Sequence, residues 1–149
     1  MGYDSKDGNH GSPMKTTFHN AHLFASDIDK TLHFYREMFG AEIIFDQEMA
    51  GARNVLILIG NGKINIYDQP PKDNARGPVH HLGIETDDLE ALTEHMKSKG
   101  FQFKNPIKEF GTWKYVMAEA PDNVQLELFQ IVDDGDSEKP FPGFSSLKQ

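Results

Sequence analysis

The chain contains two similar halves, and this repeat is the feature that most restricts its fold. Asp27 and Asp88, which each begin a predicted helix, are 61 positions apart (88 − 27). Gly40 and Gly100, which end those helices, are 60 positions apart (100 − 40). A nearly constant offset indicates a duplicated unit, and one such unit cannot bury its own sheet. We therefore expect two units that pair and share one hydrophobic core.

Each half predicts the order β-α-β-β-β. Short β-branched or aromatic runs bounded by Gly, Asn or Pro are typical of strands. The strands expected in this way are 18–25, 41–49, 53–60 and 63–69, then 80–86, 101–107, 113–119 and 124–132. Ser26 is expected to cap the first helix and Asp87 the second. The predicted fold class is α+β, with two paired β-α-β-β-β modules forming one curved eight-stranded mixed sheet around a cavity.

Composition changes along the chain predict the domain boundaries. Residues 1–15 are polar and lack periodicity, which predicts a mobile leader. Residues 16–131 are predicted to form a single domain. Within it, module one is 16–69, the linker 70–78 and module two 79–131. Residues 132–149 form a tail rich in acidic residues and proline.

Composition also restricts the partners. The formal net charge is -8, so nucleic acid and anionic membrane surfaces are unfavourable partners. The chain has no cysteine, which excludes a disulfide scaffold and a thiol nucleophile. It shows no apolar run of about 18 residues and no secretory signal pattern. We expect a cytoplasmic protein that binds a small molecule.

Histidines and carboxylates on strands are the candidates for chemistry. Residues i and i+2 of a strand point to the same face, so Glu127 points away from its neighbours Leu126 and Leu128. If the leucines pack under the helices, Glu127 faces the cavity. A carboxylate there needs a partner, which is a metal ion, a buried cation or a shared proton.

Three segments carry a resemblance to a known family. They are HLFASDIDKTLHFYREMFGAEI, HHLGIETDDLEAL and APDNVQLELFQ. Together they resemble the vicinal oxygen chelate superfamily over about residues 17 to 131. This superfamily includes glyoxalase I, bleomycin-binding proteins and extradiol dioxygenases. The resemblance is specific for the fold and weak for any one reaction, because function depends on the site.

The resemblance implies metal ligands from the first and last strand of each module. In the second module the matching residues are His81 and Glu127. In the first module they are Asn20 and Asn65, and Asn is a poor ligand for a transition metal. His22 shares a strand face with Asn20, so the predicted metal set is His22, His81 and Glu127. Two imidazoles and one carboxylate suit Zn, Ni, Co, Mn or Fe(II).

The resemblance implies a metal-dependent lyase or isomerase of glyoxalase I type, acting on a small oxygenated substrate through a metal-stabilised enediolate. Glu127 would be a ligand with the character of a base. The residues expected to line the substrate pocket are Asn20, Asn65, Tyr67 and Trp113.

Two alternatives stay open. One is a non-catalytic drug- or toxin-binding protein of bleomycin-resistance type, which Asn20 and Asn65 favour. The other is an Fe(II) ring-cleaving dioxygenase. A homodimer is expected, because relatives of this fold are commonly dimers and an open sheet leaves strand edges that pairing would cover.

Overall fold

The computed structural model describes residues 14–132, and its elements repeat the order β-α-β-β-β. The first module contains β1 (Ala21–Phe24), α1 (Ile28–Phe39), β2 (Glu42–Met49), β3 (Ala52–Ile59) and β4 (Gly62–Tyr67). The second contains β5 (Leu82–Glu85), α2 (Leu89–Ser98), β6 (Lys108–Phe110), β7 (Trp113–Ala120), the 3-10 turn η1 (Pro121–Asn123) and β8 (Val124–Ile131). The α+β class and the duplicated modules are thereby confirmed. Residues 1–13 of the expected leader and 133–149 of the expected tail lie outside the described residues.

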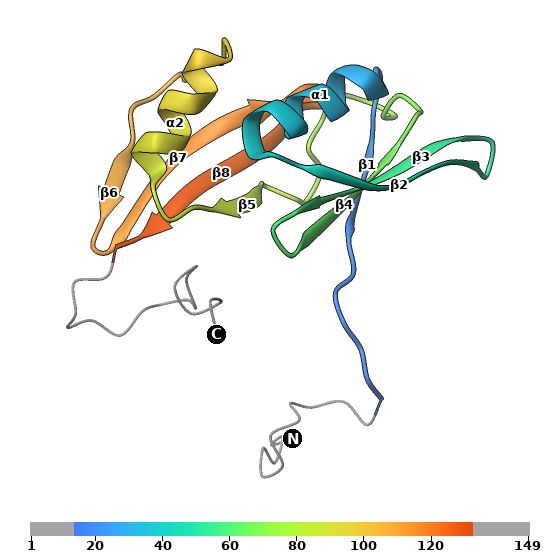
Figure 1. Cartoon of the computed structure of the whole chain (residues 1–149), viewed down its shortest axis with the longest axis horizontal. Helices are drawn as coiled ribbons and strands as arrows, with labels where there is room; N and C mark the ends of the chain where they lie inside the picture. The colour runs from blue at the N-terminus through green and yellow to red at the C-terminus, as the bar shows by residue number, and fades with distance from the viewer. Residues whose placement is uncertain (1–13, 133–149) are drawn as a thin grey trace.

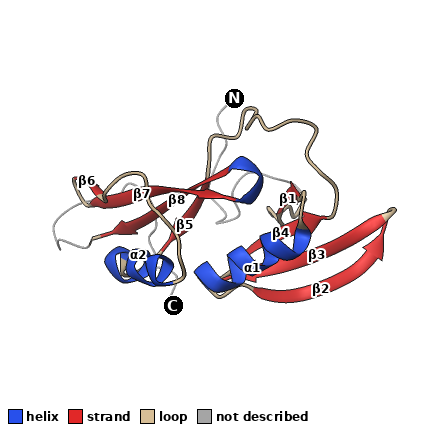
Figure 2. Ribbon diagram, turned by 90° about the horizontal axis from the view of Figure 1, so that it is seen from above, coloured by secondary structure: helices blue, strands red, loops and turns tan. Residues whose placement is uncertain are grey.

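Hydrogen bonding divides the eight strands into two four-stranded mixed sheets, in the orders β1-β4-β3-β2 and β5-β8-β7-β6. The expected mixed sheet of eight strands is therefore present as two hydrogen-bonded halves, one in each module. The first strand of each module pairs in parallel with the last strand of the same module. The two sheets lie side by side, with α1 and α2 on the same side of the molecule (Figures 1 and 2).

The core lies between the helices and one face of each sheet. Leu126 and Leu128 of β8 are fully buried there, as are Ile66 of β4, Leu89 of α2 and Tyr35 of α1. The alternation along β8 is therefore confirmed, with its leucines under the helices. The opposite face of each sheet is left open by the helices. Among residues 14–132, no helix combines the length and apolar character needed to span a bilayer.

The start of α1 differs from the expectation. Asp27, and not Ser26, is the N-cap, and its Oδ1 accepts a hydrogen bond from the Lys30 amide at 3.0 Å. Ser26 instead donates its amide and hydroxyl protons to the carboxylate of Asp122, 3.1 and 2.5 Å away in η1. This contact joins the two modules. At the other end Gly40 is the C-cap, with the left-handed φ of 65° that favours glycine.

Two expectations for the second module were also wrong. Asp88, and not Asp87, caps α2 by accepting a hydrogen bond from the Ala91 amide at 2.9 Å. The segment 101–107 forms no strand, and β6 begins at Lys108. Its Phe101 and Phe103 pack against the core, and the two rings lie 4.7 Å apart between centroids. Tertiary packing therefore overrides the strand pattern in this segment. The expected strands 18–25 and 80–86 are shorter in the structure, as Ala21–Phe24 and Leu82–Glu85.

A buried hydroxyl in the core leads to a stability prediction. Tyr35 is 0% exposed and its hydroxyl has no hydrogen-bond partner among the described residues. Burial, followed by the charge of Asp122, raises the pKa of this hydroxyl. An unpaired buried polar group destabilises the folded state, so Tyr35→Phe should leave the free energy of unfolding unchanged or raise it by about 1 kcal/mol in urea titrations.

Tyr67→Phe is the matched control. The Tyr67 hydroxyl donates a hydrogen bond to the carbonyl oxygen of Ala50 at 2.7 Å. Its removal should lower the free energy of unfolding by about 1 kcal/mol. A loss at position 35 as large as that at position 67 would show that the Tyr35 hydroxyl has a partner.

Candidate functional site

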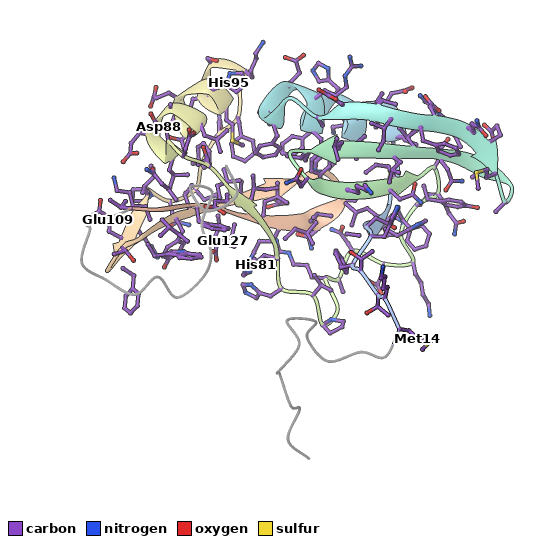
Figure 3. All side chains as sticks on the ribbon, turned by 60° about the horizontal axis from the view of Figure 1, so that its bottom comes forward. Met14, His81, Asp88, His95, Glu109 and Glu127 are labelled. Atoms are coloured by element: carbon purple, nitrogen blue, oxygen red, sulfur yellow. The ribbon has the colours of Figure 1, made fainter. Side chains whose placement is uncertain are left out.

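His81 and Glu127 form the central pair of the candidate site. His81 Nε2 lies 3.5 Å from Glu127 Oε2, and the two side chains are 34% and 18% exposed. Glu127 is on β8, where its cross-strand neighbours are Gly83 of β5 and Met117 of β7. Both side chains lie on the face of the sheet that points away from α2 (Figure 3). At this distance the imidazole nitrogen and the carboxylate oxygen can share one cation or one proton.

His80, the residue that precedes His81, also takes part in this arrangement. The two Nδ1 atoms lie 2.8 Å apart, and the rings meet edge to face with centroids 5.1 Å apart. The adjacent residues do not alternate because both precede β5, where strand geometry begins. A proton on one of the two Nδ1 atoms joins them, and this contact orients the His81 ring with Nε2 toward Glu127.

The first module gathers a second set of predicted residues. His22 lies on β1 beside β4, and its Nδ1 is 3.0 Å from the side-chain nitrogen of Asn65. The ring of Tyr67 lies 5.7 Å from that of His22 between centroids. Asn20, just before β1, has its side-chain oxygen 2.9 Å from Nδ1 of His19. His22, Asn65 and Tyr67 therefore form one cluster on the first sheet.

The strand register shows which positions of the two modules are equivalent. The parallel pairs are His22 with Asn65 in the first sheet and Gly83 with Glu127 in the second. Asn20 lies two residues before His22, just as His81 lies two residues before Gly83. Asn20 is therefore the counterpart of His81, and His22 is an additional imidazole further along the same strand.

The predicted metal set is divided between the two sheets. His81 and Glu127 are in contact at the second sheet, whereas His22 lies on the first. Within the part of the chain that the structure describes, no three His, Cys, Asp or Glu side chains gather closely enough to hold a metal ion. A single chain thus brings together two of the three predicted ligands.

Trp113 lies on the open face of the second sheet. Its ring stacks on that of Phe129 with centroids 4.4 Å apart and planes 9° apart. In the register of β7 and β8, Trp113 and Met117 both share the face of Glu127. Sequence reasoning did not single out Phe129, although it follows Glu127 by two residues and the strand period therefore places it on the same face.

The open face and the helix side of the sheets carry different charged residues. Glu85, at the end of β5, pairs in register with Phe129, and burial raises the pKa of its carboxyl. Arg53 lies on the helix side, where it contacts Asp29 of α1 at 2.9 Å and Asp46 of β2 at 2.8 Å. Its hydrogen bond lowers the pKa of the Asp46 carboxyl. Arg53 therefore joins α1 to the sheet and does not contribute to the open face.

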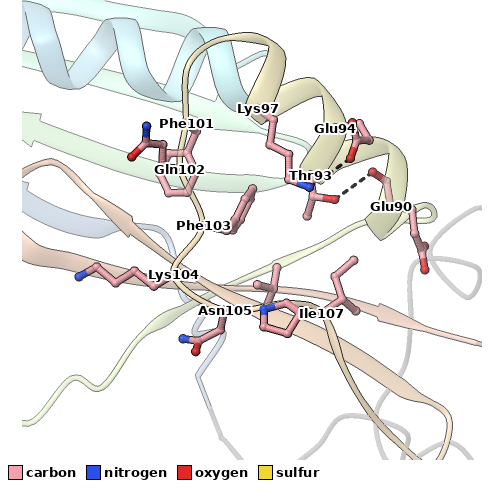
Figure 4. A pocket seen from close by; sticks show the side chains of 12 residues that line it. Glu90, Thr93, Glu94, Lys97, Phe101, Gln102, Phe103, Lys104, Asn105 and Ile107 are labelled. Atoms are coloured by element: carbon pink, nitrogen blue, oxygen red, sulfur yellow. Dashed lines mark hydrogen bonds and ion pairs between the residues drawn. The ribbon is translucent and has the colours of Figure 1, made fainter.

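A hollow of about 900 Å³ lies between α2, β7 and the segment 101–107 (Figure 4). Its lining includes Thr93, Lys97, Phe101, Phe103, Ile107 and Val116. Val116 belongs to the buried core under α2. The hollow is therefore on the helix side of the sheet and is separate from the His81–Glu127 pair.

Comparisons with known proteins agree with this architecture. Residues 17–128 match the family described as Glyoxalase/Bleomycin resistance protein/Dioxygenase superfamily. A lactoylglutathione lyase of Schizosaccharomyces pombe is 27% identical over 131 residues, covering 68% of this chain and 43% of the relative. The chain thus spans less than half the length of that relative. A probable lactoylglutathione lyase of Vibrio cholerae is 25% identical over 119 residues, covering 72% of this chain and 86% of the relative.

A solved structure supports the same fold. The fosfomycin resistance protein FosX of Listeria monocytogenes, complexed with Mn(II) and sulfate ion, superposes with a TM-score of 0.62. It is 20% identical, with 78% of this chain and 93% of that chain covered. Two β-α-β-β-β modules with a histidine–carboxylate pair on an open sheet face define a protein of the vicinal oxygen chelate class. The chain belongs to the glyoxalase, bleomycin resistance protein and dioxygenase superfamily.

Proposed function

We propose that this protein is a metal-dependent lyase or isomerase of glyoxalase I type that acts on a small oxygenated substrate. The observation that carries the proposal is the contact of 3.5 Å between His81 Nε2 and Glu127 Oε2 on an open sheet face. The similarity to lactoylglutathione lyases agrees with it.

The chemistry of this pair fits a divalent metal ion. An imidazole nitrogen and a carboxylate oxygen are ligands that Zn, Ni, Co, Mn and Fe(II) all accept. The pair is partly exposed, so an ion and a substrate oxygen can reach it. His22 is proposed as the third protein ligand.

A homodimer would supply His22. Within one chain His22 lies on the first sheet and the His81–Glu127 pair on the second. Within residues 14–132 the helices cover only one face of each sheet, so a second copy could approach the opposite faces. We propose that the first module of one subunit faces the second module of its partner, which completes the site twice in a symmetric dimer.

In this proposal each residue of the site has its own role. His81, oriented by His80, and Glu127 would hold the ion, which when bound polarises a carbonyl oxygen of the substrate. The Glu127 carboxylate is also the proposed base for a proton on the adjacent carbon, because Asn65, its counterpart in the first module, has an amide that cannot accept that proton.

Titration with Mn²⁺ tests this proposal. The wild-type protein should bind one ion per chain, measured by calorimetry after purification without a polyhistidine tag. His81→Ala should weaken binding by at least about 100-fold, since even the loss of an outer-shell partner costs 10–100-fold. His33→Ala, on the exposed surface of α1, is the control and should bind like the wild type. Absence of Mn²⁺ binding, or unchanged binding by His81→Ala, would contradict the proposal.

A second candidate is a binding protein without catalysis. It is favoured by the first module, in which the counterparts of His81 and Glu127 are the amides Asn20 and Asn65. A protein of this kind would bind its small molecule between the open faces without a metal ion. Failure to bind Mn²⁺ in the titration above would support this candidate.

A further inference from the structure

The turn η1, between β7 and β8, is the place where three separate parts of the chain meet. Asp122 of this turn accepts hydrogen bonds from the amide and the hydroxyl of Ser26, at 3.1 and 2.5 Å, at the junction of β1 and α1. Asn123 donates from its side-chain nitrogen to the carbonyl oxygen of Asn74 at 2.6 Å, and its own carbonyl oxygen accepts from Nε of Arg76 at 3.0 Å. The turn thus contacts the first module and the linker at once.

The backbone of η1 is strained at the two residues that make these contacts. Asp122 has a φ of 61° and Asn123 a φ of 60°, both in the left-handed region that residues other than glycine seldom adopt. Such a conformation persists only where the surrounding contacts hold it. The hydrogen bonds of η1 supply that restraint. They keep a carboxylate and an amide at positions where glycine would be the least strained residue.

A second contact between the modules lies at the opposite end of α1. His95 of α2 donates from Nε2 to the carbonyl oxygen of Glu37 at 2.7 Å, and Lys99 pairs with the Glu37 carboxylate at 3.0 Å. The first end of α1 is therefore held by η1 and its last end by α2. A single contact would let the modules rotate about it. Two contacts that are about 18 Å apart, the length of a 12-residue helix, define the angle between the modules.

The angle between the modules bears on the candidate site. Relative motion between the parts of one chain is the default unless a large apolar interface prevents it. In the homodimer proposed above, both sites close only if each chain presents its two modules at the same angle. His22 and the His81–Glu127 pair lie in different modules, so the angle decides whether they meet across the dimer.

We propose that Asp122 is a positioning residue, whose carboxylate fixes the angle between the modules and with it the direction in which His22 meets the partner subunit. The role of His22 rests on the function proposed above, whereas the angle within one chain does not. Asp122 acts through Ser26, and thereby through the placement of α1 and the first sheet, and not by touching the ion or the substrate.

Spin labels measure this angle directly. The chain has no cysteine, so Lys30→Cys on α1 and Ala91→Cys on α2 place one label on each module, at exposed positions. Labelled chains are mixed with an excess of unlabelled chains, so that each dimer carries at most one labelled subunit. Pulsed electron resonance should give one narrow distribution of label-to-label distances when Asp122 is present.

Asp122→Gly separates positioning from stability. Glycine removes the carboxylate but also relieves the left-handed strain, so the urea midpoint should fall by less than about 1 M. The distance distribution should nevertheless broaden about twofold or more, because one end of α1 is released. Mn²⁺ binding should weaken about tenfold, because His22 is no longer held in place. Asp122→Asn should stay close to the wild type, since the Ser26 hydroxyl can accept a hydrogen bond from an amide as well as donate one.

Ala50→Gly is the matched control. Ala50 has a φ of 54° in the exposed turn between β2 and β3, so glycine relieves the same kind of strain there without changing a contact between the modules. Its distance distribution and its Mn²⁺ affinity should match those of the wild type. A narrow distribution in Asp122→Gly, or equal broadening in Ala50→Gly, would overturn the inference.

The two readouts keep this inference apart from the proposed function. If the wild type binds no Mn²⁺, the proposed function fails, and the distance distributions alone decide whether Asp122 fixes the angle. If the wild type binds Mn²⁺ and Asp122→Gly binds it equally well despite a broader distribution, the metal proposal stands and the positioning role of Asp122 is overturned.

Discussion

Mixing His22→Ala with His81→Ala should restore Mn²⁺ binding that neither variant has alone. In a dimer in which His22 of one subunit completes the His81–Glu127 pair of the other, a mixed dimer contains one site with both changes and one intact site. Random exchange of subunits makes half of the dimers mixed, so about a quarter of the sites of the wild type should return. Refolding the two variants together and measuring the Mn²⁺-binding capacity tests this expectation.

The control is a mixture of His81→Ala with Glu127→Gln. Both changes affect the same half of the site, so every site in the mixed dimers remains damaged and capacity should stay low. No recovery with His22→Ala would show that His22 is not the ligand supplied by the partner. Recovery in both mixtures would show that the variants recover for a reason unrelated to sharing of the site.

Leu126→Ala should cause a large loss of stability in the second module. Leu126 is fully buried on β8, between Leu82 of β5 and Ala118 of β7, under α2. Removing a buried leucine side chain costs the transfer free energy of the lost atoms and leaves a cavity. The expected decrease in the free energy of unfolding is about 3 kcal/mol, within the usual range of 2–5.

Ile44→Ala serves as the control for this measurement. Ile44 lies on β2 and is 47% exposed, so its replacement should cost less than about 1 kcal/mol. Urea titrations of both variants, with the slope of the transition checked for constancy, give the comparison. Similar losses at both positions would contradict the location of the core.

The architecture follows largely from local patterns. The β-α-β-β-β order was predictable because the apolar spacing changes from helical to alternating, and because Gly40 is a clear stop signal. The segment 101–107 was mispredicted because Phe101 and Phe103 alternate like residues of a strand. In the structure Phe101 packs near Phe34 of α1, with centroids 6.2 Å apart, a contact that no local pattern reveals.

The candidate site, like the architecture, was only partly predictable from local patterns. The position of Glu127 on the open face follows from the strand period, since its neighbours Leu126 and Leu128 must be buried. The orientation of His81 does not follow, because it precedes β5 and depends on its contact with His80. Phe129 was predictable from the same period but lacked the polar chemistry that draws attention to a residue.

The sequence by itself determined the repeat, the two modules and the alternation that puts Glu127 and Phe129 on one face of β8, because these depend on spacing along a single strand or helix. Only the tertiary structure decided that the strands form two sheets, that His22 lies on the first, and that Ser26 joins Asp122 instead of capping its helix. Those outcomes depend on contacts between residues far apart in the chain, such as the 96 positions between Ser26 and Asp122. Such contacts form only when the modules pack together, so no periodicity along the sequence encodes them.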